Sequence, residues 1–105
     1  MNKIEIHIII DRFEISEYYN FKSIIYVNEE TYSLFGNSIK QNLITAGLVG
    51  ILSGFLYLEN VLKLNLEEYS IHVYSIKELN ENSINAFKDL NYYFNKYNVE
   101  LSCIY

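Results

Sequence analysis

The stretch QNLITAGLVGILSGFLYL, residues 41–58, decides the fold of this chain. It carries no charged residue and holds three of the four glycines of the protein, Gly47, Gly50 and Gly54. Such a stretch is either the buried central helix of a small α/β domain or a short membrane span. On a helix, spacings of three and four place the glycines along one face, where another backbone can approach closely. We therefore predict that this face is used for helix packing, either inside the chain or at an interface.

The membrane alternative depends on length. A spanning helix needs roughly 20 apolar residues, and the strictly apolar part here, residues 43–58, is shorter even before Thr45 and Ser53 are discounted. The first residues do not resemble a signal peptide, because charged side chains interrupt their apolar run. We expect a cytoplasmic protein, with membrane attachment as a third hypothesis only.

Length and charge limit the possible functions. The 105 residues predict one α/β domain over residues 1–105. The formal net charge is −5, and the eight Lys and Arg residues stand apart from one another. Because a nucleic-acid backbone requires clustered basic side chains, autonomous nucleic-acid binding is not expected. An acidic surface instead favours solubility and a basic protein partner. The single cysteine, Cys103, excludes an internal disulfide and a zinc site built from cysteines.

Alternation of apolar and polar residues, with many β-branched side chains, predicts five strands. Their expected ranges are 3–11, 21–27, 31–35, 69–76 and 99–105. The sequence Gly36-Asn37-Ser38 is expected to end the third strand.

Two helices are predicted between these strands. Asn37 or Ser38 is expected to cap the first, which runs to about residue 62, and Asn80 or Asn82 the second, which runs to about residue 96. The second helix carries an apolar stripe typical of a helix that covers a sheet, formed by Ile84, Phe87, Leu90, Phe94 and Tyr97. The order is β-β-β-α-β-α-β, with a mixed five-stranded sheet.

This element order resembles the core of the ribonuclease H-like fold over nearly the whole chain, without that family's usual final helix. The resemblance implies that the first helix lies against the sheet, which favours packing of the glycine face inside the chain. It also implies a site of three carboxylates that hold two magnesium ions for phosphodiester hydrolysis: an Asp on the first strand, a Glu early in the first helix and an Asp at the end of the fourth strand.

Only the first of these positions is matched in this sequence. Asp11 stands on the first strand, but Gln41 and Asn42 stand where the Glu is required, and Tyr74-Ser75 where the second Asp is required. Two divalent cations need several carboxylate oxygens to offset their charge. We therefore expect no metal and no other cofactor, and a non-catalytic protein is favoured over an enzyme.

Other candidates for chemistry have simpler interpretations. His7 and His72 could meet across a sheet to bind a metal, but no third ligand has a suggestive spacing, so two ordinary strand histidines are expected. Cys103 lies inside a predicted strand, where a small buried thiol is common and no partnered base is evident. The acidic pairs at 29–30 and 67–68 are interpreted as solvated turn residues, and the glycines form no nucleotide-binding motif.

The eleven tyrosines exceed the needs of so small a core. Tyrosine is an effective interface residue because it combines a large apolar area with a polar tip. The pairs Tyr18-Tyr19 and Tyr92-Tyr93 are the predicted binding residues, since adjacent aromatic side chains cannot both point into one core. The alternative is compositional: a chain rich in Ile, Asn, Lys and Tyr is typical of an AT-rich gene, which raises tyrosine everywhere.

Two functions of different class follow from these observations. The first is a small acidic protein-binding module, of the inhibitor or immunity and anti-defence type, from a low-GC bacterium, phage or plasmid. The second is a ribonuclease H-like, metal-dependent nuclease or nucleic-acid-processing factor that uses Asp11, with Glu14 or Glu78 supplying further ligands. A homodimer through the edge of the terminal strand is a further possibility.

Overall fold

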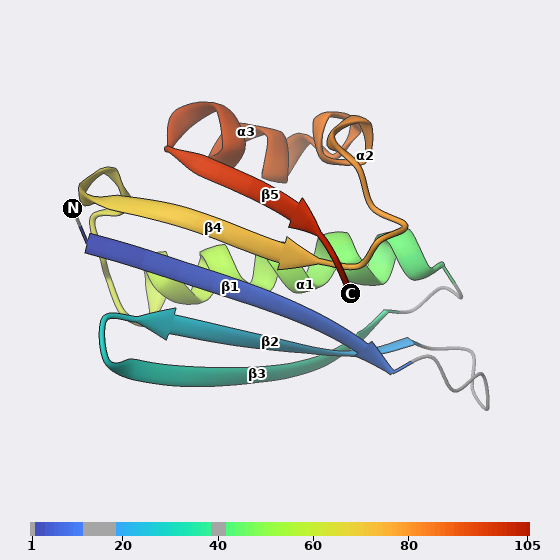
Figure 1. Cartoon of the computed structure of the whole chain (residues 1–105), viewed down its shortest axis with the longest axis horizontal. Coiled ribbons are helices and arrows are strands. Elements are labelled where there is room, and N and C mark those ends of the chain that lie inside the picture. The colour runs from blue at the N-terminus through green and yellow to red at the C-terminus, as the bar shows by residue number, and fades with distance from the viewer. Residues whose placement is uncertain (1, 12–18, 39–41) are drawn as a thin grey trace.

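Five strands form one mixed sheet in the order β3-β2-β1-β4-β5 (Figure 1). The central strand, β1 (Asn2–Asp11), pairs antiparallel with β2 (Tyr19–Val27) and parallel with β4 (Tyr69–Ser75). The edge strands are β3 (Glu30–Ser38), which is antiparallel to β2, and β5 (Val99–Cys103), which is parallel to β4. The terminal strand predicted as a dimer contact is thus one edge of the sheet.

The structure, a computed structural model, describes residues 2–11, 19–38 and 42–105. Within these ranges it confirms a single α/β domain with a five-stranded mixed sheet. Its α-helices number three instead of the predicted two: α1 (Leu43–Asn60), α2 (Glu81–Ala86) and α3 (Lys88–Lys96). A short 3₁₀ turn, η1 (Leu66–Glu68), precedes β4.

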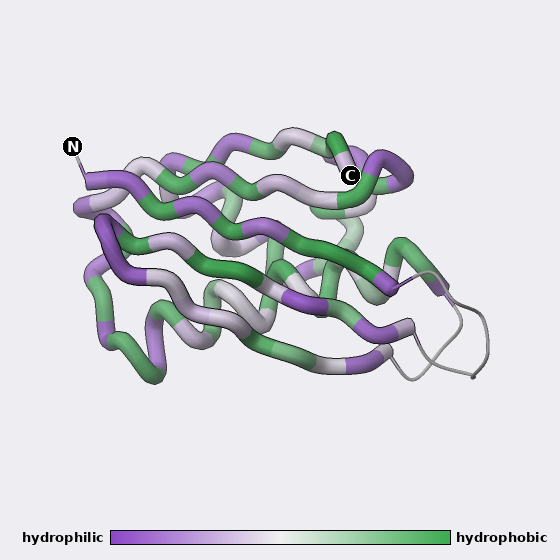
Figure 2. The backbone as a smooth tube through the Cα atoms, turned by 60° about the horizontal axis from the view of Figure 1, so that its bottom comes forward, coloured by the Kyte–Doolittle hydropathy of each residue, from purple (hydrophilic) through white to green (hydrophobic). Residues whose placement is uncertain are grey.

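The helices lie on one side of the sheet (Figure 1), so the molecule has two layers. Successive side chains along a strand point to opposite faces of the sheet, and hydrophilic and hydrophobic residues alternate along the first part of β1 in Figure 2. On β1 the side chains of Ile4, Ile6 and Ile8 point toward the helices and are fully buried. The side chains between them point to the other face, which no helix covers in the described part of the chain. The described part of the chain therefore leaves one face of the sheet open.

The glycines of α1 allow this helix to lie close to the sheet. A methyl group added at Gly50 would lie 3.1 Å from Cγ2 of Ile8, and one at Gly54 would lie 3.1 Å from Cγ2 of Ile6. A methyl group at Gly47 would lie 3.3 Å from Cδ1 of Ile76, the residue that follows β4. Side chains seldom approach so closely in a packed core. The glycine face is therefore packed inside the chain, against the sheet.

By length and composition alone, α1 could also cross a membrane. In the structure it is the core helix of the domain, and eight of its residues are buried, with Ile51, Phe55 and Leu58 fully enclosed. That burial gives its apolar sequence a role within a compact, soluble-looking domain.

The predicted end of the third strand was wrong, because β3 continues through Gly36 to Ser38. A methyl group at Gly36 would lie 2.4 Å from Cζ of Phe21, so the missing side chain makes room for an aromatic ring on the neighbouring strand. The predicted caps Asn37 and Ser38 accordingly belong to the strand. The cap of α1 is Asn42, whose side chain accepts a hydrogen bond of 3.1 Å from the backbone N–H of Thr45.

The prediction of one continuous second helix was also wrong, because two helices, α2 and α3, stand in its place. Its predicted cap at Asn80 is correct, since the side chain accepts a hydrogen bond from the N–H of Ser83. The helical segment then breaks at Phe87, whose backbone is extended with φ −96° and ψ 98°. The apolar stripe still faces the core on both sides of the break, because Ile84 and Leu90 are buried.

Candidate binding face on the open side of the sheet

The open face gathers large apolar and aromatic side chains from several strands. Ile9, Tyr26, Phe35 and Tyr105 are exposed there, and Phe35 is 75% exposed. Cross-strand register places Ile9 and Phe35 in one row, on either side of Lys22 on β2. An apolar group so exposed on a sheet is typical of an interaction surface.

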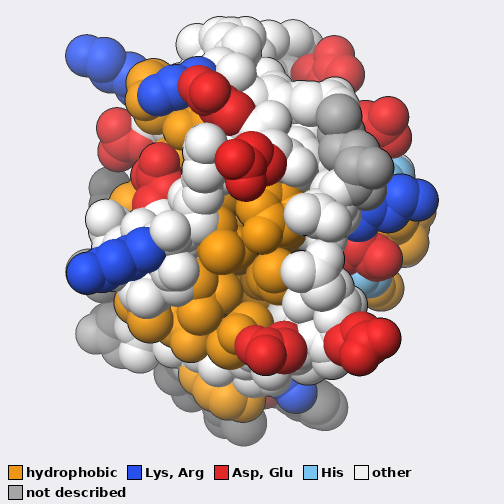
Figure 3. All heavy atoms as spheres, turned by 90° about the vertical axis from the view of Figure 1, so that its left-hand side faces the viewer, with side chains coloured by type: hydrophobic (Ala, Val, Ile, Leu, Met, Phe, Trp, Pro, Cys, Tyr) orange, Lys and Arg blue, Asp and Glu red, His pale blue; other side chains and the backbone are white. Residues whose placement is uncertain are grey.

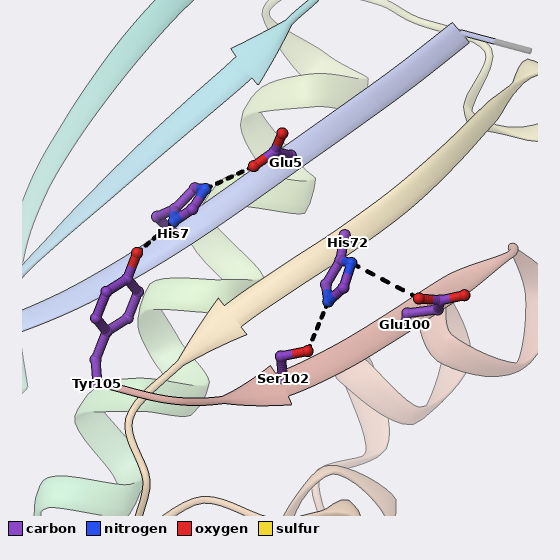
Figure 4. A network of polar contacts seen from close by, with 6 residues as sticks. All are labelled: Glu5, His7, His72, Glu100, Ser102 and Tyr105. Atoms are coloured by element: carbon purple, nitrogen blue, oxygen red, sulfur yellow. Dashed lines mark hydrogen bonds and ion pairs between the residues drawn. The ribbon is translucent and has the colours of Figure 1, made fainter.

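A stack of three rings occupies the centre of this face (Figure 4 labels its two histidines). The ring of Tyr74 on β4 stacks against His72 with centroids 4.1 Å apart, and against His7 on β1 with centroids 4.4 Å apart. The interplanar angles are only 9° and 10°. Tyr26 meets His7 edge-on at 5.4 Å. These contacts hold the side chains in one arrangement before any partner arrives.

Polar contacts fix both imidazoles further (Figure 4). Nδ1 of His7 lies 2.6 Å from the Tyr105 hydroxyl, and Nε2 lies 2.9 Å from Oε1 of Glu5. One neutral tautomer satisfies both contacts, since Tyr105 then donates to Nδ1 while the Nε2–H donates to Glu5. Burial raises the pKa of Tyr105, and the nearby groups Tyr26, Tyr74 and Glu5 raise it further. The terminal tyrosine is therefore held in its protonated form on this face.

The second imidazole belongs to a constellation of serine, histidine and glutamate. Nε2 of His72 lies 2.7 Å from Oγ of Ser102, and Nδ1 lies 3.6 Å from Oε2 of Glu100. A nucleophile, a base and an orienting carboxylate have this connectivity in hydrolases. Acyl transfer also requires N–H donors aimed at the developing oxyanion. The N–H groups of paired strands point within the plane of the sheet, so this flat face does not present them to a substrate above it.

Two shallow hollows flank the ring stack. One, of about 280 Å³, is apolar and includes Ile9, Lys22 and Phe35, with the Lys22 ammonium 5.5 Å from the centre of the Phe35 ring. The other, of about 260 Å³, is polar and includes Lys3 and Glu100. The face thus offers an apolar end and a charged end.

The predicted tyrosine pair on α3 is divided between core and surface. Tyr93 is 6% exposed, whereas Tyr92 is 52% exposed. Both line a groove of about 320 Å³ between α1 and α3, together with Leu52 and Leu56. Tyr92 is the member of this pair that a partner could contact, and the exposed Tyr92 ring lies beneath the ammonium group of Lys96.

Tyr93 has a structural role instead. Its hydroxyl donates to the carboxylate of Glu59 at the end of α1, and Tyr97 donates to the other oxygen of that carboxylate at 3.5 Å. Burial and the hydrogen bond to Glu59 raise the pKa of Tyr93. The ring of Tyr93 stacks on that of Phe55 at 4.7 Å. Tyr93 is thus mostly enclosed, and its part in a binding surface stays a prediction.

The other predicted pair is described only in part. Tyr19 begins β2 and is half-buried against the core, while Tyr18 lies outside the described residues. Tyr19 packs against the core and so does not belong to the ring stack on the open face.

Asp11 ends β1, opposite Asn20 of β2, and is exposed. Of the further ligands considered for a nuclease, Glu14 lies outside the described residues and Glu78 follows β4. Within residues 2–11, 19–38 and 42–105, no group of three or more His, Cys, Asp or Glu side chains lies close enough to hold a metal ion. Cys103 is half-buried in β5, and burial raises the pKa of its thiol.

One sequence signal for the open face is the isoleucine at position 9. Ile9 stands among polar residues on the outward side of β1, where an alternating strand that faces only water should carry a polar side chain. The convergence of Tyr26, Tyr74 and Tyr105 on His7 depends on strand register and on the path of the C-terminus, which the sequence alone does not specify.

The fold and the face together define a two-layer α/β domain with an uncovered aromatic sheet surface. No protein-family model matches this sequence, and no curated protein matches it significantly.

Proposed function

We propose that this chain is a non-catalytic module that binds a protein partner, and that the open sheet face is its contact surface. The observation that carries the proposal is the group of exposed side chains formed by Ile9, Tyr26, Phe35 and Tyr105. Covering these side chains removes apolar area from water, which is the main favourable term in protein association. The ring stack beneath them is already ordered, so little side-chain entropy is lost on binding.

Such a module acts by occupying its partner's surface, as inhibitors and bacterial immunity or anti-defence proteins do. The net charge of −5 supports a basic partner. A composition rich in Ile, Asn, Lys and Tyr, without Pro or Trp, supports an origin in a low-GC bacterium, phage or plasmid, and we place the protein in the cytoplasm.

A ribonuclease H-like fold is part of the proposal. It is supported by the order of elements, since three strands are followed by a helix, a strand, a helical segment and a final strand. The nuclease alternative has weaker support, because it depends on Asp11 without a group of carboxylates around it in the described residues. Magnesium-dependent cleavage that is lost in Asp11→Asn would favour this alternative.

The test compares co-purification by matched variants expressed with a tag in low-GC bacterial cells. Ile9→Thr combined with Phe35→Thr removes apolar area from the open face and keeps side chains that suit strands. Val61→Thr is the control, since Val61 is 60% exposed beyond the end of α1. We expect one stoichiometric protein partner with the wild type and the control, and its loss in the double variant.

Two results would contradict the proposal. If the wild-type chain retains no protein, the binding function is wrong. If the double variant retains the partner as well as the control does, the open face is not the contact surface. Circular dichroism of each variant separates lost binding from lost folding.

A further inference from the structure

A second concave site lies away from the ring stack, at the end of the molecule that is turned toward the viewer in Figure 3. It is a pocket of about 500 Å³ between the β2–β3 turn and the segment that links α1 to β4. Figure 3 shows hydrophobic side chains gathered at the centre of this end, with acidic side chains beside them. The residues that line the pocket are Val27, Asn28, Glu29, Glu30, Tyr32, Leu62, Leu64 and Tyr69.

Two tight turns give the pocket its walls. Val27 pairs with Glu30, so only two residues connect β2 to β3, and Asn28 adopts a positive φ of 55° there. After α1 the chain reverses at Lys63, with φ 54°, and the N–H of Leu64 bonds to the carbonyl of Leu58 at 3.0 Å. Both walls are therefore held by backbone geometry.

The chemistry of the lining is divided in two. Leu62, Leu64 and the ring of Tyr69 supply apolar surface, while Glu29 and Glu30 supply carboxylates. None of the eight lining residues is basic. The pocket therefore combines an apolar wall with negative charge.

The aromatic wall is held in position. The Tyr32 hydroxyl donates to the carboxylate of Glu30, and this hydrogen bond is the main cause of the raised pKa of Tyr32. The ring of Tyr32 also packs against that of Tyr57 with centroids 5.6 Å apart. A ring fixed in this way beside a carboxylate is a suitable surface for a cation.

We propose that this pocket binds an arginine or lysine side chain of a protein partner; the inference rests on the proposed function and adds a second point of contact to it. The long stem of a basic side chain covers apolar surface while its charged head keeps polar contacts. Here the stem packs on Leu62 and Leu64, and the head meets the tyrosine rings and the carboxylates of Glu29 and Glu30. An apolar side chain would cover the carboxylates without supplying a hydrogen-bond donor, and a phosphate would be repelled by them.

The test is a titration of the ¹⁵N-labelled chain with an acetylated, amidated leucine-arginine-leucine peptide at low salt. The same peptide with glutamine in place of arginine is the ligand control. We expect amide shifts to change around residues 28–32 and 62–69 with the arginine peptide and much less with the glutamine peptide. The variant Glu29→Gln combined with Glu30→Gln should weaken binding about tenfold, because both charge-assisted contacts are lost.

The matched control variant is Glu67→Gln combined with Glu68→Gln. It removes the same charge from the same end of the molecule, but neither residue lines the pocket. We expect this control to weaken binding clearly less than Glu29→Gln/Glu30→Gln does, since neither of its carboxylates contacts the bound arginine.

The inference is overturned if the arginine peptide causes no localised shifts, if both peptides bind equally, or if the two double variants bind alike. The outcome is separable from that of the proposed function. A partner that co-purifies equally with Glu29→Gln/Glu30→Gln and with the wild type leaves the binding module intact and removes the pocket from its interface. If the wild type retains no partner, the module proposal fails, and the peptide titration still decides the pocket.

Discussion

Replacement of the α1 glycines by alanine tests how tightly the helix is packed on the sheet. In a helix interior, alanine is more favourable than glycine by about 1 kcal/mol. At Gly50, however, the new methyl group would lie 3.1 Å from Ile8 and 3.3 Å from the ring of Phe21, and both neighbours are buried. Overpacking of a well-filled core costs about 1–3 kcal/mol. We expect Gly50→Ala to lower the free energy of unfolding by about 1 kcal/mol net.

Gly54→Ala should have a similar effect, because its methyl group would lie 3.1 Å from Ile6. Gly47→Ala should leave the free energy of unfolding nearly unchanged. The nearest neighbour of its methyl group would be Cδ1 of Ile76 at 3.3 Å, the flexible end of a side chain. The expected order of stability is therefore Gly47→Ala above Gly54→Ala and Gly50→Ala.

The assay is urea unfolding followed by far-ultraviolet circular dichroism. The control is the pair Leu56→Ala and Leu56→Gly, because Leu56 is 42% exposed on the same helix. The difference between these two variants measures helix propensity without a clash. If Gly50→Ala and Gly54→Ala stabilise the protein by as much as that difference, the close packing of α1 on β1 is refuted.

Four other predictions concern single side chains. The Ser23 hydroxyl is buried and donates to a carbonyl of α1 at 2.8 Å, so Ser23→Ala should cost about 1–2 kcal/mol in a urea melt. The buried hydroxyl of Ser75 has no hydrogen-bond partner among the described residues, so Ser75→Ala should leave the free energy of unfolding unchanged or raise it in the same melt. A loss of stability like that of Ser23→Ala would contradict this prediction. Burial raises the pKa of Cys103, so its thiol should react with a disulfide reagent at pH 8 more slowly in the native protein than in urea. Equal reaction rates would count against a buried thiol. Burial and the hydrogen bond to Glu59 raise the pKa of Tyr93 in the folded state, so the protonated hydroxyl stabilises the fold below the unfolded pKa of about 10, and this stabilisation declines as the pH rises above that value. Tyr93→Phe should therefore reduce the alkaline loss of stability seen in thermal melts. An unchanged pH profile would contradict this role of Tyr93.

The strands were predictable because each is a local pattern. Alternation of isoleucine with polar residues identifies β1 and its buried face without knowledge of its neighbours. The glycine spacing of α1 likewise indicates a closely packed face, although it does not identify the side chains it meets. These features depend only on residues near one another in the chain.

The errors arose where distant residues decide the structure. Gly36 has the character of a strand breaker in the sequence, but the ring of Phe21 on the neighbouring strand occupies the space beside it. At Phe87 the apolar stripe indicates which side is buried and says nothing about the direction of the helix axis, so the break was not predicted. The division of Tyr92 from Tyr93 was expected in principle, but only packing against α1 determines which ring is inside.

The open face is best understood as a preformed surface. A sheet side that faced only water would carry polar residues at alternate positions, yet Ile9 and Phe35 stand there beside aromatic rings. The contacts of Tyr74 with two imidazoles and of Tyr105 with His7 hold the surface rigid at little further entropic cost. Rigid aromatic surfaces give affinity without a large area, and that property suits a domain of only 105 residues. Because these contacts join β1, β4 and the segment that follows β5, a substitution at Tyr74 should weaken the proposed partner binding more than its own exposure would indicate.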